Sequence, residues 1–218
     1  MYDVKKQLQS LAEKLPQGVR LVAVSKFHPV ERLREAYDAG QRIFGENRPQ
    51  ELAAKVPQLP ADIEWHFIGH LQTNKLKLVL PYVSLVQSVD SLHLLEAIDR
   101  WGREHGRTIP VLLELHLGAE ETKQGFSADE IREILGRTYN NIAFRGLMGM
   151  ATNTDDDGII ESDFCRIEAL FKELREEFPA LADFKELSIG MSADWPIAVR
   201  HGATMVRIGT DIFGPREY

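Results

Sequence analysis

The chain has 218 residues, of which 44% are hydrophobic and 27% charged, a composition typical of a soluble globular protein. Its net charge of −7 and its scattered basic residues argue against a general nucleic-acid binder. No apolar run approaches the roughly 18 residues of a membrane-spanning helix, and one cysteine cannot form an intramolecular disulfide. The first fifteen residues mix acids, bases and leucines and lack the apolar core of a signal peptide, so we expect a cytoplasmic protein.

An amphipathic helix is predicted at the N-terminus, before any strand. Its apolar face consists of Val4, Leu8, Leu11 and Leu15. Eight short β-branched or apolar runs then alternate with helical patterns to the end of the chain. The predicted strands are Val19–Ser25, Arg42–Gly45, Glu64–Ile68, Leu85–Val89, Pro110–His116, Ile142–Met148, Glu186–Ile189 and Met205–Ile208.

The stretches between the strands have the spacing and the boundary residues of helices. The clearest apolar stripe is Ile160, Phe164, Ile167, Phe171, Leu174 and Phe178, and another is marked by Val30, Leu33, Tyr37 and Gly40. Pro29 is expected at a first helical position, Ser91 and Ser127 as N-caps, and Gly40 and Gly106 at helix ends.

Strands that alternate with helices pair in parallel through right-handed crossovers, either in a closed barrel or in an open doubly wound sheet. An open sheet would favour a glycine-rich nucleotide turn after the first strand, but that turn reads Ser25-Lys26-Phe27-His28-Pro29, and no such motif occurs elsewhere. We therefore predict an α/β fold, a (β/α)8 barrel with an extra N-terminal helix, near the lower length limit of roughly 200 residues. The acidic turn Asp155–Gly158 is interpreted as a solvated loop and helix cap, and no linker divides residues 1–218, so one domain is expected.

Lys26 directly follows the first predicted strand. In a (β/α)8 barrel, functional groups gather at the carboxyl ends of the strands. An amine at this position would enter the barrel mouth, where partial desolvation favours the neutral form that attacks a carbonyl. A lysine that merely extends to the solvent at the rim is the alternative.

Two turns that contain glycine and hydroxyl residues follow the seventh and eighth strands. They read Ser188-Ile189-Gly190-Met191-Ser192 and Arg207-Ile208-Gly209-Thr210. Barrels commonly bind a phosphate there with backbone N–H groups and hydroxyls, although ordinary turns favour the same residues. A phosphate-bearing aldehyde would bridge Lys26 and these turns, and pyridoxal 5′-phosphate (PLP) is the common cofactor of that shape.

Several motifs spread along the chain can be compared with known families. They are Ala23-Val24-Ser25-Lys26, Phe44-Gly45-Glu46-Asn47, His66-Phe67-Ile68-Gly69-His70-Leu71-Gln72-Thr73-Asn74-Lys75, Arg145-Gly146-Leu147-Met148, Ser188-Ile189-Gly190-Met191-Ser192 and Val206-Arg207-Ile208-Gly209-Thr210. Jointly they resemble the pyridoxal phosphate homeostasis protein family, PLP-binding proteins related to the barrel domain of alanine racemase. The resemblance runs nearly from end to end.

The resemblance implies a set of cofactor-binding residues. Lys26 would form the internal aldimine, Ser192, Gly209 and Thr210 would hold the phosphate, and Asn47 and Met191 would lie near the cofactor. Arg207 resembles the arginine that faces the pyridine nitrogen in fold-type III proteins, and contact with the phosphate is the alternative. The sequence departs from the family pattern at Arg48-Pro49, where an aromatic or aliphatic pair is expected, and at His116, where asparagine is usual.

Other chemistry is not expected. His66 and His70 lie on a strand and loop rather than on one helix face, so even with Glu114 and His116 nearby we predict no metal site. Cys165 lies within an amphipathic helix and is expected to pack in the core. Ser192 lacks the G-x-S-x-G context of a hydrolase nucleophile.

The resemblance implies a protein of intracellular PLP homeostasis that binds, buffers and delivers the cofactor. The alternative is a PLP-dependent amino-acid racemase or decarboxylase of fold type III. Those enzymes add a C-terminal β domain, whereas only residues 211–218 follow the last turn here, and an opposing acid/base is not evident, with Tyr82 and Tyr139 left open. We therefore expect a monomeric, non-catalytic carrier, with apo PLP-dependent enzymes as its partners and without nucleic-acid or membrane partners.

Overall fold

The computed structural model describes residues 2–117 and 124–215 and contains a closed parallel barrel. Its strands follow the chain order, and β1 pairs with both β2 and β8. The strands are β1 Arg20–Val24, β2 Ile43–Glu46, β3 Glu64–Phe67, β4 Val83–Val89, β5 Ile109–Glu114, β6 Ile142–Met148, β7 Glu186–Ser188 and β8 Met205–Ile208. All eight predicted strands are present within two residues at each end, so the predicted barrel is confirmed.

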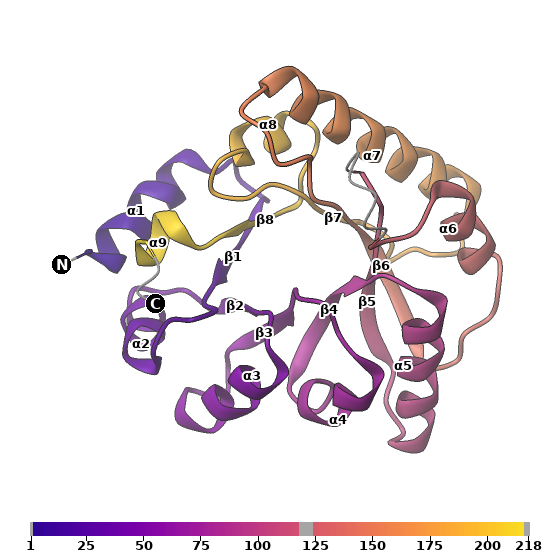
Figure 1. Ribbon diagram of the computed structural model, residues 1–218, viewed down its shortest axis with the longest axis horizontal. Helices are drawn as coiled ribbons and strands as arrows, with labels where there is room; N and C mark the ends of the chain where they lie inside the picture. The colour runs from indigo at the N-terminus through magenta and orange to yellow at the C-terminus, as the bar shows by residue number, and fades with distance from the viewer. Residues whose placement is uncertain (1, 118–123, 216–218) are drawn as a thin grey trace.

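Helices surround the barrel in Figure 1. They are α1 Val4–Lys14, α2 Val30–Asp38, α3 Pro49–Lys55, α4 Leu76–Val79, α5 Leu92–Glu104, α6 Ala128–Leu135, α7 Asp157–Glu177, α8 Trp195–Arg200 and α9 Thr210–Phe213, with 3-10 turns η1 Val56–Gln58 and η2 Thr73–Lys75. Because every strand is parallel to its neighbours, the carboxyl ends of all eight meet at one rim.

Local sequence determines where the helices begin and end. Ser91 and Ser127 cap α5 and α6 as predicted, and Ser127 forms a reciprocal capping box with Glu130. The placement of Pro29 is wrong by one position: it is the N-cap of α2, because its ψ of 160° is extended rather than helical. Asp156 caps α7 through the N–H of Gly158, so the acidic turn is a helix cap as predicted.

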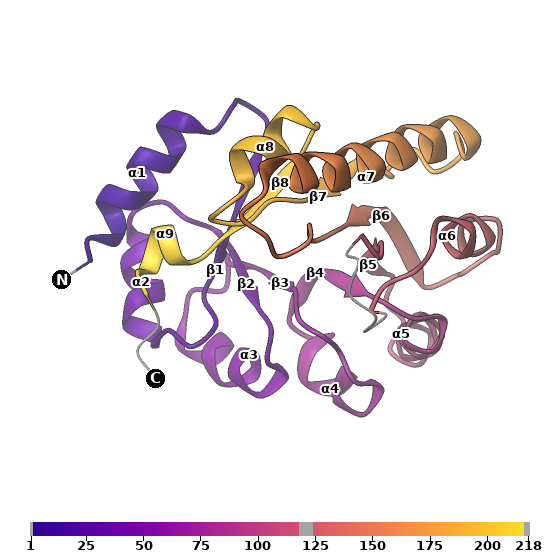
Figure 2. The same cartoon turned by 45° about the horizontal axis from the view of Figure 1, so that its top comes forward.

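The extra N-terminal helix packs beside the C-terminal one. Both views place α1 next to α9 and α2 (Figures 1 and 2), and Gly214, which follows α9, lies against the ring of Tyr2. Arg32 on α2 donates hydrogen bonds to the carbonyl oxygens of Tyr2 and Phe213, at 2.9 and 3.4 Å. Helix α2 thus connects both ends of the described chain, close to the end of β1.

Apolar side chains form two layers. A small cluster fills the barrel interior, and it consists of Val22, Leu85, Leu112, Met148 and Met205. A larger cluster lies between the strands and the helices and includes the predicted face of α7. The expectation that Cys165 packs in this core is wrong, because it lies on the polar face of α7 beside Glu161 and Ala169 and is exposed.

The length of the barrel domain stays a prediction over 1–218, since residue 1, residues 118–123 and residues 216–218 lie outside the described ranges. Among the described residues, no helix combines the length and the apolar character needed to cross a membrane.

Candidate functional site

A cavity of about 320 Å³ opens at the carboxyl rim, over the ends of β1, β2, β7 and β8. Its described lining consists of Val24, Lys26, His28, Asn47, Ile68, Gly69, Met150, Met191, Ser192, Ala193, Arg207, Gly209, Thr210 and Gly214. All seven residues singled out from the sequence are among them, because the ends of parallel strands converge at this rim. The structure thus brings these residues together, and their binding roles stay predictions.

The turn after β1 places Lys26 in the cavity wall. The strand ends at Val24, and helix α2 begins at Val30. Within this turn Phe27 has a φ of +67°, a left-handed conformation that is rare for a bulky side chain. Such strain persists only where surrounding contacts hold it, and it is frequent at functional sites.

The turns after β7 and β8 line the same cavity as Lys26. In the first, Gly190 has a φ of +93°, and Asp194 accepts a hydrogen bond from the Met191 N–H at 2.5 Å. In the second, β8 continues through Gly209 into α9. In the described part of the chain, the N–H groups of Ser192, Gly209 and Thr210 have no backbone acceptor, and these groups therefore remain available to an anion.

Arg207 forms the buried floor of the cavity. Its Nη1 donates to the carbonyl and hydroxyl oxygens of Ser188, both at 2.7 Å, and its Nη2 donates to the Gly149 carbonyl at 2.9 Å. Burial lowers the pKa of Arg207 to about 10, against the opposing effect of the carboxylates of Glu114 and Asp194. The guanidinium therefore keeps its positive charge at neutral pH.

Burial also changes the pKa values of two carboxylates near Arg207. Burial, with help from Asp90, raises the pKa of Glu114 to about 7, although Arg207 and His70 act in the opposite direction. Burial also raises the pKa of Asp194, opposed by the Met191 N–H and by Arg207. No described residue that lines the cavity is itself acidic, so the lining favours an anionic ligand.

Asn47 presents an unsatisfied acceptor at the end of β2. Its side-chain Oδ1 is buried and receives no hydrogen bond within the described structure. The backbone of Gly69 lies against Asn47, where an added Cβ would come within 2.4 Å of the Asn47 carbonyl oxygen. A buried carbonyl oxygen without a donor is costly, so this position suits a ligand that carries an O–H or N–H group.

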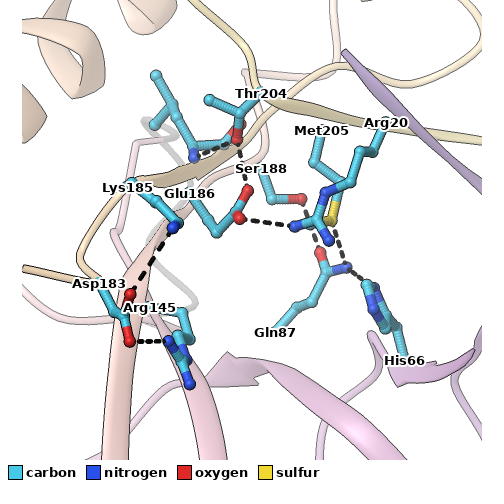
Figure 3. Close-up of polar contacts among 11 residues, drawn as sticks. Arg20, His66, Gln87, Arg145, Asp183, Lys185, Glu186, Ser188, Thr204 and Met205 are labelled. Atoms are coloured by element: carbon cyan, nitrogen blue, oxygen red, sulfur yellow. Dashed lines mark hydrogen bonds and ion pairs between the residues drawn. The ribbon is translucent and has the colours of Figure 1, made fainter. Parts of the chain in front are cut away.

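A chain of buried hydrogen bonds links β7, β4 and β3 across the barrel (Figure 3). The Ser188 hydroxyl donates to Gln87 Oε1 at 2.6 Å, and Gln87 Nε2 lies 2.8 Å from His66 Nδ1. Burial lowers the pKa of His66 to about 3, with a smaller contribution from Arg20. His66 is therefore a neutral core residue.

The remaining sequence candidates lie elsewhere. His70 is exposed and pairs with Asp90 at 2.7 Å. The residues that depart from the family pattern, Arg48-Pro49 and His116, do not line the cavity. Arg48 stacks on the Phe27 ring, Pro49 begins α3, and His116 borders a hollow between α6 and α7. No group of three or more potential metal ligands occurs within residues 2–117 and 124–215.

Sequence reasoning missed several lining residues. Ile68 and Gly69 occur in a recognised motif but were not assigned to the site. The lining position of His28 follows from its place two residues after Lys26, a signal that was available. Met150, Ala193 and Gly214 carry no chemical signal, and only the folded chain places them there.

Comparisons with known proteins identify the family. The family described as alanine racemase, N-terminal domain, matches residues 3–217. The pyridoxal phosphate homeostasis protein of Pasteurella multocida is 37% identical over 212 residues, which cover 95% of this chain and 91% of that protein. The chain belongs to the pyridoxal phosphate homeostasis protein family.

Solved structures of related proteins agree with this assignment. PipY of Synechococcus elongatus, solved without PLP, has a TM-score of 0.92 and 40% identity, over 97% of this chain and all of that one. The structure of PipY with PLP bound has a TM-score of 0.90 and 39% identity, with the same coverage. Alanine racemase from E. faecalis, at 18% identity and a TM-score of 0.73, covers 98% of this chain and 58% of its own. At this low identity, the likeness to alanine racemase shows a shared fold and nothing about activity.

Proposed function

We propose that this protein binds PLP as a Schiff base on Lys26, and that it stores and delivers the cofactor rather than catalysing amino-acid chemistry with it. One observation carries the proposal: a single cavity is lined both by Lys26 and by the turns after β7 and β8, where the N–H groups of Ser192, Gly209 and Thr210 have no backbone acceptor in the described chain. PipY, a relative with 39% identity, was solved with PLP bound, and other relatives are named for pyridoxal phosphate homeostasis.

The polar groups of the cavity fit the parts of PLP. Ser192, Gly209 and Thr210 supply N–H and hydroxyl donors for the phosphate. The orphaned Oδ1 of Asn47 would accept a hydrogen bond from a ligand donor such as a ring hydroxyl. Arg207 is held against β6 and β7 by Ser188 and Gly149, which favours a contact with the ring over one with the phosphate.

The residues of the chain then have distinct tasks. Lys26 would hold the cofactor through its amine, which would form a C=N bond with the aldehyde carbon and release the carbonyl oxygen as water with the two amine protons. PLP so held is an electron sink for amino-acid chemistry when an enzyme supplies further groups. A buried cationic Arg207 at the pyridine nitrogen would keep that nitrogen unprotonated and weaken this sink.

The carrier role is supported by the titratable groups of the lining. Among the described lining residues these are Lys26, His28 and Arg207. Racemisation needs a second acid/base opposite the lysine, and the tyrosines left open by the sequence, Tyr82 and Tyr139, do not line the cavity. We further propose that the protein acts as a monomer in the cytoplasm and that apo PLP-dependent enzymes receive the cofactor.

Borohydride reduction of the PLP-loaded protein tests the covalent site. Peptide mass mapping is expected to find the pyridoxyl group on Lys26. Modification of another lysine, or equal labelling of Lys26→Ala and the wild type, would overturn the assignment. Delivery is tested separately, by the activity that an apo PLP enzyme regains when it is mixed with the loaded protein.

A further inference from the structure

The turn that carries Lys26 is bound to a buried ionic network outside the cavity. Lys55, the last residue of α3, is 5% exposed. Its Nζ donates to the Ser25 carbonyl oxygen at 2.8 Å and to one carboxylate oxygen each of Glu46 and Glu51, both at 2.7 Å. Ser25, which directly precedes Lys26, also donates its hydroxyl to Glu46 at 2.6 Å. The residue before Lys26 is thus held at its backbone and at its side chain.

Glu51 holds the residue that follows Lys26. The carboxylate oxygen that receives Lys55 also accepts a hydrogen bond from the Phe27 N–H at 2.7 Å. Within the described part of the chain, Phe27 is the one residue other than glycine that has a positive φ. The Arg48 guanidinium stacks on its ring, with Cζ 4.2 Å from the ring centroid. Helix α3 and its N-cap residue therefore contribute both contacts that support the strained conformation.

Stability alone does not account for this arrangement. Burying an ion pair costs as much desolvation as the pair returns, so apolar residues would stabilise the fold at least as well. The carboxylate of Glu46 even leaves its Oε2 without a partner, and burial raises the pKa of Glu46 to about 7 in spite of Lys55. None of Glu46, Glu51 and Lys55 lines the cavity.

We propose that Glu51 and Lys55 are positioning residues that fix the backbone on both sides of Lys26 and so aim its amine at the aldehyde of the ligand. This inference rests on the proposed function of Lys26. Without the network, Phe27 relaxes toward a negative φ and the Lys26 side chain leaves from a different backbone direction. The phosphate turns follow β7 and β8, and neither Glu51 nor Lys55 is hydrogen-bonded to them, so the turns are expected to keep their contacts.

The test compares two ligands that differ at the reacting carbon. PLP carries an aldehyde, whereas pyridoxine 5′-phosphate carries an alcohol there and cannot form the C=N bond. The ratio of the two dissociation constants measures the covalent contribution. Glu51→Gln keeps the shape of the side chain and removes its charge, and Lys55→Met removes the central cation. Glu133→Gln is the matched control, because Glu133, exposed on α6, pairs with Arg137 just beyond the helix at the same i,i+4 spacing.

The wild type and Lys26→Ala are measured first. The wild type should prefer PLP, and Lys26→Ala should lose that preference; if it does not, the proposed function fails independently of the positioning claim. Given a preference that depends on Lys26, we expect Glu51→Gln and Lys55→Met to weaken PLP binding at least ~10-fold while pyridoxine 5′-phosphate binding stays within about twofold. Borohydride labelling of Lys26 should fall in parallel. Glu133→Gln should change the affinity for neither ligand.

Two results would overturn the positioning role. One is a Glu51→Gln protein that prefers PLP over pyridoxine 5′-phosphate as strongly as the wild type does. The other is an equal loss of affinity for both ligands, which indicates general damage to the site. Lys55→Met leaves Glu46 buried without a cation and is the variant most exposed to misfolding. Glu51, whose side chain is 19% exposed, therefore decides the question. In a Lys26→Ala background, Glu51→Gln should cause no further loss of PLP binding.

Discussion

Arg207 on β8 is bound through Ser188 on β7 to the far side of the barrel. Its Nη1 lies 2.7 Å from the Ser188 hydroxyl, and that hydroxyl donates its own proton to Gln87. Gln87 Nε2 then donates to His66 Nδ1, so the His66 proton resides on Nε2. Each member of this chain is hydrogen-bonded to the next, so a change at one member leaves a buried partner unsatisfied.

Ser188→Ala is expected to destabilise the protein through this chain. Gln87 Oε1 loses its donor, and Arg207 loses the hydroxyl acceptor and keeps the backbone carbonyl oxygens of residue 188 and Gly149. We expect the free energy of unfolding in urea to fall by about 1–3 kcal/mol, the cost of buried groups left unpaired. Ser84→Ala, at an exposed strand position where the hydroxyl donates to a backbone carbonyl, should stay within about 0.5 kcal/mol of the wild type. Equal effects of the two substitutions would contradict this account.

The buried His66 should make stability depend on pH. Folded His66 takes up its proton only near pH 3, whereas the unfolded residue does so near the usual histidine pKa of 6.5. As the pH falls below 6.5 the unfolded state binds the proton first, so this contribution to stability is lost progressively toward pH 3. Between pH 6.5 and 5 the loss is about 2 kcal/mol, at about 1.36 kcal/mol per pH unit.

Removing the imidazole should remove that dependence. His66→Asn retains an acceptor for Gln87, and its free energy of unfolding, relative to the wild type, should rise by about 2 kcal/mol from about pH 6.5 to 5. The raised pKa values of Glu46 and Glu114 act in the opposite direction, but both proteins contain them. His93→Gln, at an exposed position, is the control and should follow the wild type. Parallel pH profiles for wild type and His66→Asn would refute the neutral state of His66.

Two glycines with the same backbone conformation offer a matched test of the turn after β7. Gly190 has a φ of +93° and Gly18 a φ of +94°, but an added Cβ meets Ala198 Cβ at 2.6 Å in the first and open space in the second. Gly18→Ala should cost about 1 kcal/mol from backbone strain alone. Gly190→Ala should cost more than that in thermal unfolding and should also weaken ligand binding, since Met191 and Ser192 follow it. Equal costs would exclude a role for the close contact.

The fold and the cavity could be predicted from sequence for a common physical reason. Strands of a closed barrel are buried on both faces, so each appears as a short apolar run, and parallel pairing brings their carboxyl ends together. This pattern alone was enough to place Lys26, Asn47 and Arg207 at one rim. Whether Arg207 faces the ring or the phosphate could not be predicted, because this depends on its bonds to Ser188 and Gly149.

The positioning network was beyond sequence reasoning. A glutamate four residues before a lysine, as in Glu51 and Lys55, is the usual pattern of a solvated helix face. Here both side chains turn instead toward the loop after β1, and the burial of Lys55 depends on how α3 packs. The positive φ of Phe27 could not be predicted from the sequence either, since glycine or asparagine usually occupies a left-handed backbone position. Tertiary contacts overrode the local pattern at these positions.

The phosphate of the ligand should supply much of its affinity. Neutral hydrogen bonds contribute about 0.5–1.5 kcal/mol each and charge-assisted ones about 1.5–3, so pyridoxal should bind at least ~100-fold more weakly than PLP. Ser192→Ala and Thr210→Val remove one hydroxyl each from the proposed cradle. Both substitutions should weaken the binding of PLP in a titration and leave the affinity for pyridoxal unchanged. Equal affinity of the wild type for PLP and pyridoxal would refute the placement of the phosphate.

The PLP-loaded protein should not turn over amino acids. An acid/base opposite Lys26 is needed for rapid proton transfer at the α-carbon, and among the described lining residues His28 carries an imidazole, the side chain most often used for that task. Its ring packs on Phe213 at a centroid distance of 4.9 Å, on the same turn as Lys26 rather than across the cavity. Both groups therefore approach a ligand from neighbouring positions.

The assay incubates the loaded protein with L- and D-amino acids in deuterated water. We expect no multiple-turnover racemisation, decarboxylation or transamination, and the same result for His28→Ala. Slow exchange of the α-proton that persists in His28→Ala is compatible with a carrier, because a C=N bond to PLP acidifies that proton without a tuned partner. Rapid turnover that disappears in both Lys26→Ala and His28→Ala would establish an enzyme, since it would show that these two residues exchange protons with a substrate.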